Sequence, residues 1–242
     1  MAKFWDSELP VGYYDSVFKE GLRKGRGIQA NWHNLTFKKI KLYLKDNMDH
    51  LDYACGPGTF IGNFSNVNSI GVDIANNQIE YASYNYQNKF KFYNLEEFQI
   101  HHSKDKFDLI TVLGLFEFIN EDEMISVLDQ LYEKLNPKGK LIFTTPNFNN
   151  FQFRLLLLLL NFFNDTSYKK QHINKLNLKR IKNIVQRSKF EKKFITINKF
   201  LNLGISLSIF NLKLGEKANN ILENLFLNKY GYLICCTLEK KL

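Results

Sequence analysis

An acidic residue and three glycines follow the first strong apolar run of the chain. The stretch "LDYACGPGTFIGNF" contains Asp52, Gly56, Gly58 and Gly62. Glycines directly after a strand allow a sharp turn, and they let backbone N–H groups approach a ligand near the N-terminus of the next helix. A carboxylate at Asp52 would repel a pyrophosphate and attract an ammonium group. The stretch therefore predicts a backbone-lined site for a small ligand that carries a positive charge.

The spacing of the glycines argues against two other nucleotide-binding loops. Gly56, Gly58 and Gly62 form G-x-G-x-x-x-G, whereas the dinucleotide fingerprint requires G-x-G-x-x-G, and Ile61 stands where its third glycine would be. No Gly-Lys-Ser or Gly-Lys-Thr follows, which excludes a Walker loop.

Alternating strand and helix patterns must position this loop. Short apolar runs predict strands at residues 50–54, 68–74, 89–95, 106–113, 140–146, 192–198 and 230–238. Other segments predict helices up to about residue 46 and at residues 59–64, 76–86, 121–136, 151–163, 174–190 and within 199–228. Strands that alternate with helices imply right-handed crossovers and a mostly parallel sheet covered on both faces.

Four motifs, in their order and spacing, resemble those of class I S-adenosylmethionine-dependent methyltransferases. The first motif is an acidic residue followed by x-G-x-G-x-G, and Asp52, Ala54, Gly56 and Gly58 occupy those positions here. Ala54 replaces the first glycine, which narrows the turn but leaves a backbone carbonyl to meet the amino group of the cofactor. The resemblance implies that these residues bind S-adenosylmethionine.

The other motifs imply the remaining cofactor contacts. "GVDIA" resembles the second motif, in which Asp73 accepts both ribose hydroxyls and Ile74 lies on the adenine face. "KFYNLEEF" resembles the third, in which Asn94 replaces the usual Asp and pairs with the adenine amino group beside the N–H of Leu95. "FDLITVLGLFEFI" resembles the fourth-strand motif, and we expect Leu113 beside the cofactor.

The resemblance is strong from Asp49 to Asn147 and implies an α/β, Rossmann-like fold. We expect a seven-stranded, mostly parallel sheet with an antiparallel last strand and helices on both faces. In a chain of 242 residues, we expect one domain and no second independent one. Within it, residues 1–46 form an N-terminal helical lid, residues 47–147 the cofactor-binding core, and residues 148–242 a substrate-side elaboration with the last two strands.

The residues after the fourth strand argue against several methyl acceptors. Enzymes that methylate amino groups of nucleic acids are expected to carry Asp/Asn-Pro-Pro-Tyr where this chain has "TVLGLFEF". A cytosine-5 enzyme needs a cysteine nucleophile nearby, and protein-arginine enzymes use paired glutamates where only Glu117 appears. Small-molecule O-methyltransferases of the ubiquinone-biosynthesis type typically have Leu-Glu-His, but Phe118 replaces the histidine here. We expect a small-molecule, glycan or lipid-linked acceptor.

His172 and His33 are the candidate catalytic residues. His172 follows the fifth strand, on the side where acceptors enter this fold. Its segment resembles a "Y…QH" feature of methyltransferases from surface-polysaccharide and lipid-linked gene neighbourhoods. His33 belongs to the N-terminal helix that usually lids the cofactor. Either imidazole can take the proton of an acceptor hydroxyl or hold that hydroxyl in line, and the alternative for each is a solvated or helix-capping histidine.

The charge balance leaves a second hypothesis open. A net charge of +9 favours anionic partners such as nucleic acid, phosphorylated molecules or an anionic membrane. The alternative function is a non-catalytic, methyltransferase-like scaffold associated with RNA through this basic surface. Asp52, Gly56, Gly58 and Asp73 favour the enzyme, because a scaffold needs no ribose-binding carboxylate. Nucleic acid is therefore not the partner that we expect.

Cysteine usage and apolar segments predict the compartment. Cys55, Cys235 and Cys236 make neither a disulfide framework nor a zinc spacing, so we expect a reducing cytoplasm and no metal site. The N-terminal residues lack the basic and apolar segments of a signal peptide. The leucine-rich segment 151–163 carries Arg154 and is shorter than the ~20 residues of a spanning helix. We expect peripheral membrane contact at most.

Overall fold

Seven strands form one mixed sheet in the computed structural model, which describes residues 8–163, 172–226 and 230–241. They are β1 (Asp49–Tyr53), β2 (Asn68–Asp73), β3 (Lys91–Asn94), β4 (Phe107–Leu113), β5 (Leu135–Pro146), β6 (Ile195–Phe200) and β7 (Leu233–Glu239). Their order across the sheet is β3-β2-β1-β4-β5-β7-β6. Strand β7 pairs antiparallel with β5 and β6, and all other pairs are parallel, which confirms the predicted reversal of the last strand.

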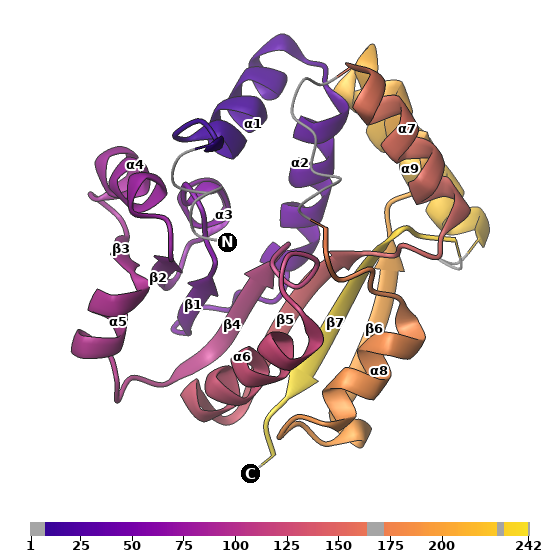
Figure 1. The fold of residues 1–242 in the computed structure, drawn as a ribbon. Helices are drawn as coiled ribbons and strands as arrows, with labels where there is room; N and C mark the ends of the chain where they lie inside the picture. The colour runs from indigo at the N-terminus through magenta and orange to yellow at the C-terminus, as the bar shows by residue number, and fades with distance from the viewer. Residues whose placement is uncertain (1–7, 164–171, 227–229, 242) are drawn as a thin grey trace.

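Helices cover both faces of the sheet (Figure 1). The α-helices are α1 (Tyr13–Lys24), α2 (Ile28–Lys41), α3 (Thr59–Phe64), α4 (Asn76–Tyr86), α5 (Leu95–His101), α6 (Glu121–Lys134), α7 (Phe151–Phe163), α8 (Leu178–Gln186) and α9 (Leu212–Phe226). Two 3-10 segments, η3 (Lys192–Phe194) and η4 (Leu203–Ile209), flank β6. The Rossmann-like fold that the motifs implied is therefore present.

Alternation along the strands divides the core between the two faces. On β5, Leu141 and Phe143 point to the cluster formed with α5, α6 and α8, whereas Ile142 points to the cluster formed with α2, α3 and α7. The same alternation on β7 sends Cys236 to the first cluster and Cys235 to the second. Both faces of the central strands are buried, as expected for a sheet between two helical layers.

The N-terminal region, which the sequence pattern predicted as helical up to about residue 46, consists of two helices, α1 and α2. Gly25 ends α1 with φ 67° and donates its N–H to carbonyls of the last turn, and Gly27 has φ 130° just before α2. Both conformations suit glycine because it lacks a Cβ. The two glycines turn the chain so that α2 can lie over the sheet (Figure 1).

Strand β5 begins five residues before the predicted start at Lys140. Leu135 pairs with Phe107, and Lys140 pairs with Leu109, so the ladder contains a register shift. Within the shift, Lys138 has φ 63°. Helix α6 therefore ends at Lys134, before the predicted end at residue 136, and the "NPKG" stretch forms a bulge near the start of β5.

No helix in the described parts of the chain is both long and apolar enough to cross a membrane.

Candidate active site

A cavity of about 600 Å³ lies at the carboxyl ends of β1, β2, β4 and β5. The glycine loop and the ends of β1 and β2 line one end of it, which we call the loop end. The ends of β4 and β5, helix α7 and His172 line the other end, which we call the β5 end. Helix α2 covers the cavity. Ligands of open α/β sheets bind at this edge.

The glycine loop contains three alternate residues in the left-handed conformation. Ala54, Gly56 and Gly58 have φ values of 61°, 53° and 72°. A Cβ built on Gly56 would meet nothing within 4 Å, so the loop leaves open space there for a ligand. A Cβ on Gly58 would lie 2.7 Å from the Phe92 ring, so this glycine is needed for packing, and it does not line the cavity.

Asp73 ties the glycine loop to the end of β2. Its Oδ2 accepts a hydrogen bond from the N–H of Gly56 at 2.8 Å, and its Oδ1 accepts one from the N–H of Ala75 at 2.9 Å. A carboxylate oxygen can accept more than one hydrogen bond, so Asp73 can also serve a ligand. Ile74, which follows it, is 42% exposed and lines the cavity. The structure therefore places Asp73 and Ile74, the two residues of the second motif that were predicted to contact the cofactor, at the loop end.

Asp52 is the end point of a buried chain of hydrogen bonds. The hydroxyl of Thr111, opposite Asp52 in the β1–β4 register, donates to Asp52 Oδ1 at 2.6 Å. His50 Nε2 lies 2.9 Å from Thr111 Oγ1, and His50 Nδ1 lies 2.9 Å from Ser69 Oγ. Because Thr111 donates its proton to Asp52, it accepts from His50, so Nε2 carries the imidazole proton and Nδ1 accepts from Ser69. Each donor in this series of hydrogen bonds points toward Asp52.

Burial controls the protonation states of Asp52 and His50 in this series of hydrogen bonds. It raises the pKa of Asp52 to about 7, against the Thr111 hydrogen bond, which lowers it, and the nearby charge of Asp73 raises it further. It lowers the pKa of His50 to about 3, so the imidazole is neutral at neutral pH. Sequence reasoning missed His50 and Thr111. One sequence signal could have identified His50: it lies two residues from Asp52 on a strand, so the two side chains share a face.

Only some of the remaining residues that were predicted to bind the cofactor line the cavity. Leu95 and Leu113 line the cavity, as do Asp52 and Ala54. Asn94 does not line it, and its Oδ1 accepts from the N–H of Glu97 at 2.8 Å, which caps α5. The contact between Asn94 and adenine stays a prediction.

Both predicted catalytic histidines line the cavity. The ring of His172 lies 5.0 Å from the ring of Phe118 and 5.5 Å from that of Phe148. The ring of His33 stacks on Phe37 at 5.4 Å. Burial lowers the pKa of each histidine to about 4, so both imidazoles are neutral at neutral pH and each has a nitrogen that can accept a proton.

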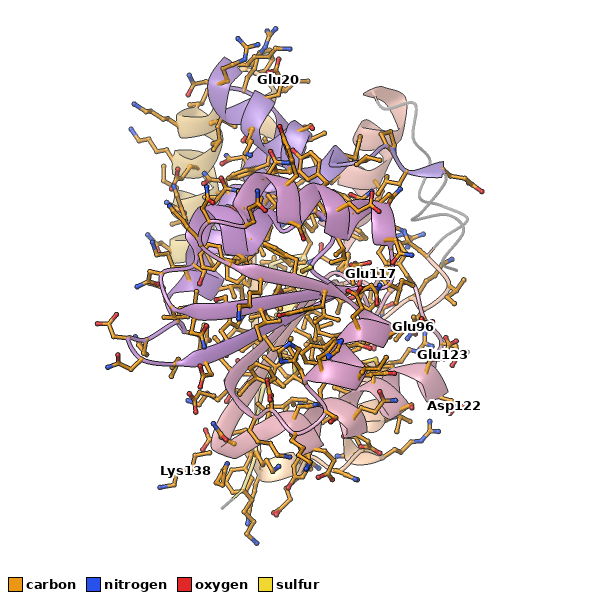
Figure 2. All side chains as sticks on the ribbon, turned by 90° about the vertical axis from the view of Figure 1, so that its left-hand side faces the viewer. Glu20, Glu96, Glu117, Asp122, Glu123 and Lys138 are labelled. Atoms are coloured by element: carbon orange, nitrogen blue, oxygen red, sulfur yellow. The ribbon has the colours of Figure 1, made fainter. Side chains whose placement is uncertain are left out.

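Glu117 places a third titratable side chain at the β5 end. It is only 5% exposed, and Figure 2 shows it well inside the molecule compared with Glu20 and Lys138. Burial raises the pKa of its carboxyl to about 7, and the nearby Thr145 hydroxyl lowers it somewhat without reaching hydrogen-bond geometry. Sequence reasoning considered Glu117 as an unpaired glutamate after the fourth strand and as the glutamate of the Leu-Glu-His pattern, and it did not place Glu117 in this site.

Within the described ranges, no three His, Cys, Asp or Glu side chains gather in an arrangement that could hold a metal ion. The buried thiol of Cys55 has a pKa well above its usual value, because burial and the nearby Asp73 and Asp52 disfavour the thiolate. Its side chain is therefore a packing group in the loop.

Comparisons with known proteins agree with this architecture. A family model described as "Methyltransferase domain" matches residues 28–192. A possible histamine N-methyltransferase from Thermotoga maritima is 14% identical, with 88% of this chain and 91% of that chain covered and a TM-score of 0.63. An S-adenosylmethionine-dependent methyltransferase from Archaeoglobus fulgidus is 18% identical, with 86% and 93% covered and a TM-score of 0.58.

Magnesium protoporphyrin IX methyltransferase from Synechocystis, solved with bound S-adenosylhomocysteine, is 13% identical, with 95% of this chain and 97% of that chain covered and a TM-score of 0.57. Identities this low show a shared fold alone. A comparison with curated protein sequences finds no match. Since the family model spans well over half of the chain and the sheet has the class I order, the chain belongs to the methyltransferase-domain family.

Proposed function

We propose that this protein transfers the methyl group of S-adenosylmethionine to a hydroxyl of a small-molecule, glycan or lipid-linked acceptor. The observation that carries the proposal is one cavity that joins the glycine loop and Asp73 at the loop end to His172 and Glu117 at the β5 end. Donor and acceptor must lie in one enclosed space, because transfer requires the acceptor oxygen in line with the methyl group.

The residues at the loop end fit the cofactor. Gly56 leaves open space beside its backbone, Asp73 offers carboxylate oxygens for two ribose hydroxyls, and Ile74 offers an apolar surface for adenine. Asp52 offers a carboxyl to an ammonium group, and that charge would favour its ionised form. When bound, S-adenosylmethionine supplies a methyl group that its sulfonium already activates.

The β5 end supplies the groups that handle the acceptor. We propose that the neutral imidazole of His172 takes the proton of the acceptor hydroxyl or holds that hydroxyl in line. His33, on α2, is the alternative for the same role. Phe118 and Phe148 pack beside His172 and restrict its ring, and Phe118, which lines the cavity, provides an apolar wall for the acceptor.

A surface feature supports an acceptor that lies in or near a membrane. Leu214, Ile221 and Leu225 are exposed at helical spacing on α9, and Phe210, which precedes this helix, is 73% exposed. An amphipathic helix with such a face and nearby lysines can lie on an anionic bilayer. We propose peripheral contact through α9, and sedimentation with anionic vesicles tests it: the protein should pellet with them, and it should remain in the supernatant if the proposal is wrong.

Two measurements test the proposed activity. Calorimetry should show binding of S-adenosylmethionine and of S-adenosylhomocysteine, and absence of both would favour a non-catalytic scaffold. Incubation of glycan and lipid extracts with methyl-labelled cofactor, followed by mass spectrometry, should then show label on a hydroxyl oxygen. Label found only on nitrogen or carbon would refute O-methylation but not methyl transfer.

A further inference from the structure

Glu117 is a buried acid with an unused hydrogen-bonding atom. Its Oε2 has no hydrogen-bond partner in the part of the chain that the structure describes, although the residue lines the cavity. A buried polar atom without a partner costs free energy, and a ligand that supplies the missing donor recovers it. The carboxyl therefore points to a ligand group that can donate a hydrogen bond.

The backbone holds Glu117 at a fixed place near the end of β4. Gly114, with φ 80°, turns the chain there, and its N–H donates to the carbonyl of Thr144 at 3.2 Å. A Cβ on Gly114 would lie 3.6 Å from Glu117 Oε1, so the carboxyl sits over that turn. The backbone carbonyl of Glu117 accepts from the N–H of Asn174 at 3.1 Å, which joins this turn to the segment that carries His172. Glu117 is thus held at the β5 end by backbone contacts that leave Oε2 of its carboxyl without a partner among the described residues.

A second unpartnered atom lies at the same end of the cavity. Thr145 is fully buried at the end of β5 and lines the cavity, and its Oγ1 also lacks a hydrogen-bond partner among the described residues. A carboxyl and a hydroxyl together can both accept from and donate to one ligand hydroxyl. Most of the side chains that line this end are apolar, including Phe118, Phe153 and Leu157, and His172 lies beside Phe118. The site therefore suits an apolar molecule with a single polar group.

The charge of the site favours a hydroxyl over an ammonium group. An ammonium ion in an apolar pocket needs a permanently ionised partner, because desolvation of a charge is costly. Glu117 is the buried carboxyl at this end, since Glu123, which also lines the cavity, is exposed and caps α6. Burial favours the protonated form of Glu117. A hydroxyl can pair with either form, since it donates to a carboxylate and accepts from a carboxylic acid.

We propose that Glu117, assisted by Thr145, binds the hydroxyl of an apolar methyl acceptor at the β5 end of the cavity. The inference rests on the proposed function and narrows its acceptor to an apolar molecule that presents one hydroxyl. It gives Glu117 a binding role that can be measured without the natural acceptor and without turnover.

A matched pair of probes tests the inference. The probes are naphthol and its methyl ether, methoxynaphthalene, titrated by fluorescence into protein saturated with S-adenosylhomocysteine. The wild type should bind naphthol about 10-fold more tightly than the ether, which corresponds to ~1.4 kcal/mol, because naphthol can donate a hydrogen bond to the carboxyl and the ether cannot. Glu117→Ala should lose that preference, and Glu117→Gln should keep part of it. The control Glu96→Gln changes an exposed acid on α5 (Figure 2) and should behave as the wild type.

The outcomes separate this inference from the proposed function. If S-adenosylhomocysteine binds but the wild type shows no preference for naphthol, or binds neither probe, the role of Glu117 is refuted and the proposed function stands. An unchanged preference in Glu117→Ala has the same meaning. If S-adenosylhomocysteine itself does not bind, the proposed function fails and this inference fails with it. Unchanged affinity of the Glu117 variants for S-adenosylhomocysteine shows that they are folded.

Discussion

The acidic side chains at the two ends of the cavity differ in their hydrogen-bond partners. At the loop end, Asp52 accepts from Thr111, and Asp73 accepts from two backbone N–H groups. At the β5 end, Glu117 Oε2 and Thr145 Oγ1 have no hydrogen-bond partner in the described structure. Oxygens that the protein already holds in place are preorganised for a ligand. The open hydrogen-bonding positions at the β5 end indicate that a ligand completes that end.

The largest expected effect lies at the β5 end. His172→Ala should lower turnover with the acceptor identified from extracts by about 10²–10⁴, because a group that takes or positions a proton is lost. Affinity for S-adenosylmethionine, measured by calorimetry, should stay nearly unchanged, because the loop end is intact. The control His101→Ala removes an exposed histidine on α5 and should have wild-type turnover. Wild-type turnover in His172→Ala would exclude His172 from the mechanism and leave His33 as the candidate for its role.

The next effect lies at the loop end and has the opposite signature. Asp73→Ala should weaken S-adenosylmethionine binding by roughly 30- to 1,000-fold, which corresponds to about 2–4 kcal/mol, because two charge-assisted contacts are lost. The hydrogen bond that holds the Gly56 N–H is lost as well. Asp46→Ala, at an exposed position before β1, is the control in the same calorimetric titration. An affinity within about threefold of the wild type would contradict the assignment of Asp73 to the cofactor.

The pH dependence of the free energy of unfolding tests whether the Glu117 carboxyl is buried and protonated. The folded-state pKa of Glu117 is raised to about 7, whereas an unfolded glutamate titrates near ~4.3. Between these values the folded state keeps a proton that the unfolded state releases, so the contribution of Glu117 to stability is present at low pH and is lost as the pH rises toward 7. Glu117→Gln does not titrate, and its stability relative to the wild type should increase by about 1–3 kcal/mol from pH ~4 to pH ~8.

Urea unfolding of the cofactor-free protein at the two pH values measures this difference. A comparison with the wild type is needed because the buried histidines titrate in the opposite direction: their lowered pKa values make the folded state more stable as the pH rises. Glu96→Gln should show no such change. A constant difference between Glu117→Gln and the wild type would mean that the Glu117 carboxyl has an ordinary pKa in the folded protein.

The sequence predicts the loop end better than the β5 end because the two ends are encoded differently. Ala54, Gly56 and Asp73 lie in short local patterns in which the residue type and the neighbouring strand together indicate the role. The buried chain of hydrogen bonds through His50 and Thr111 depends on which strands pair, and the residue types alone do not record that pairing.

The β5 end depends on contacts between distant segments. Glu117 becomes a site residue because its turn meets Asn174 and the end of β5, and no local pattern records those contacts. The seven-stranded sheet and the reversal of β7 followed from the resemblance. The bulge at Lys138 and the break between α1 and α2 were missed, because local backbone geometry at single residues decides them.

The smallest expected effect concerns Ala54, which occupies a glycine position of the loop with φ 61°. A left-handed conformation costs a residue with a Cβ roughly 1–2 kcal/mol, and the greater freedom of glycine in the unfolded chain offsets part of the gain from replacing it. Ala54→Gly should therefore raise the free energy of unfolding by about 0.5–1 kcal/mol, measured as a higher urea midpoint with an unchanged slope. Ala82→Gly, at a buried position within α4, should instead lower it by about 1 kcal/mol or more, because helical glycine is unfavourable. If both variants were destabilised to the same degree, Ala54 would carry no backbone strain, and the alanine would be as well suited to the loop as the glycine that it replaces.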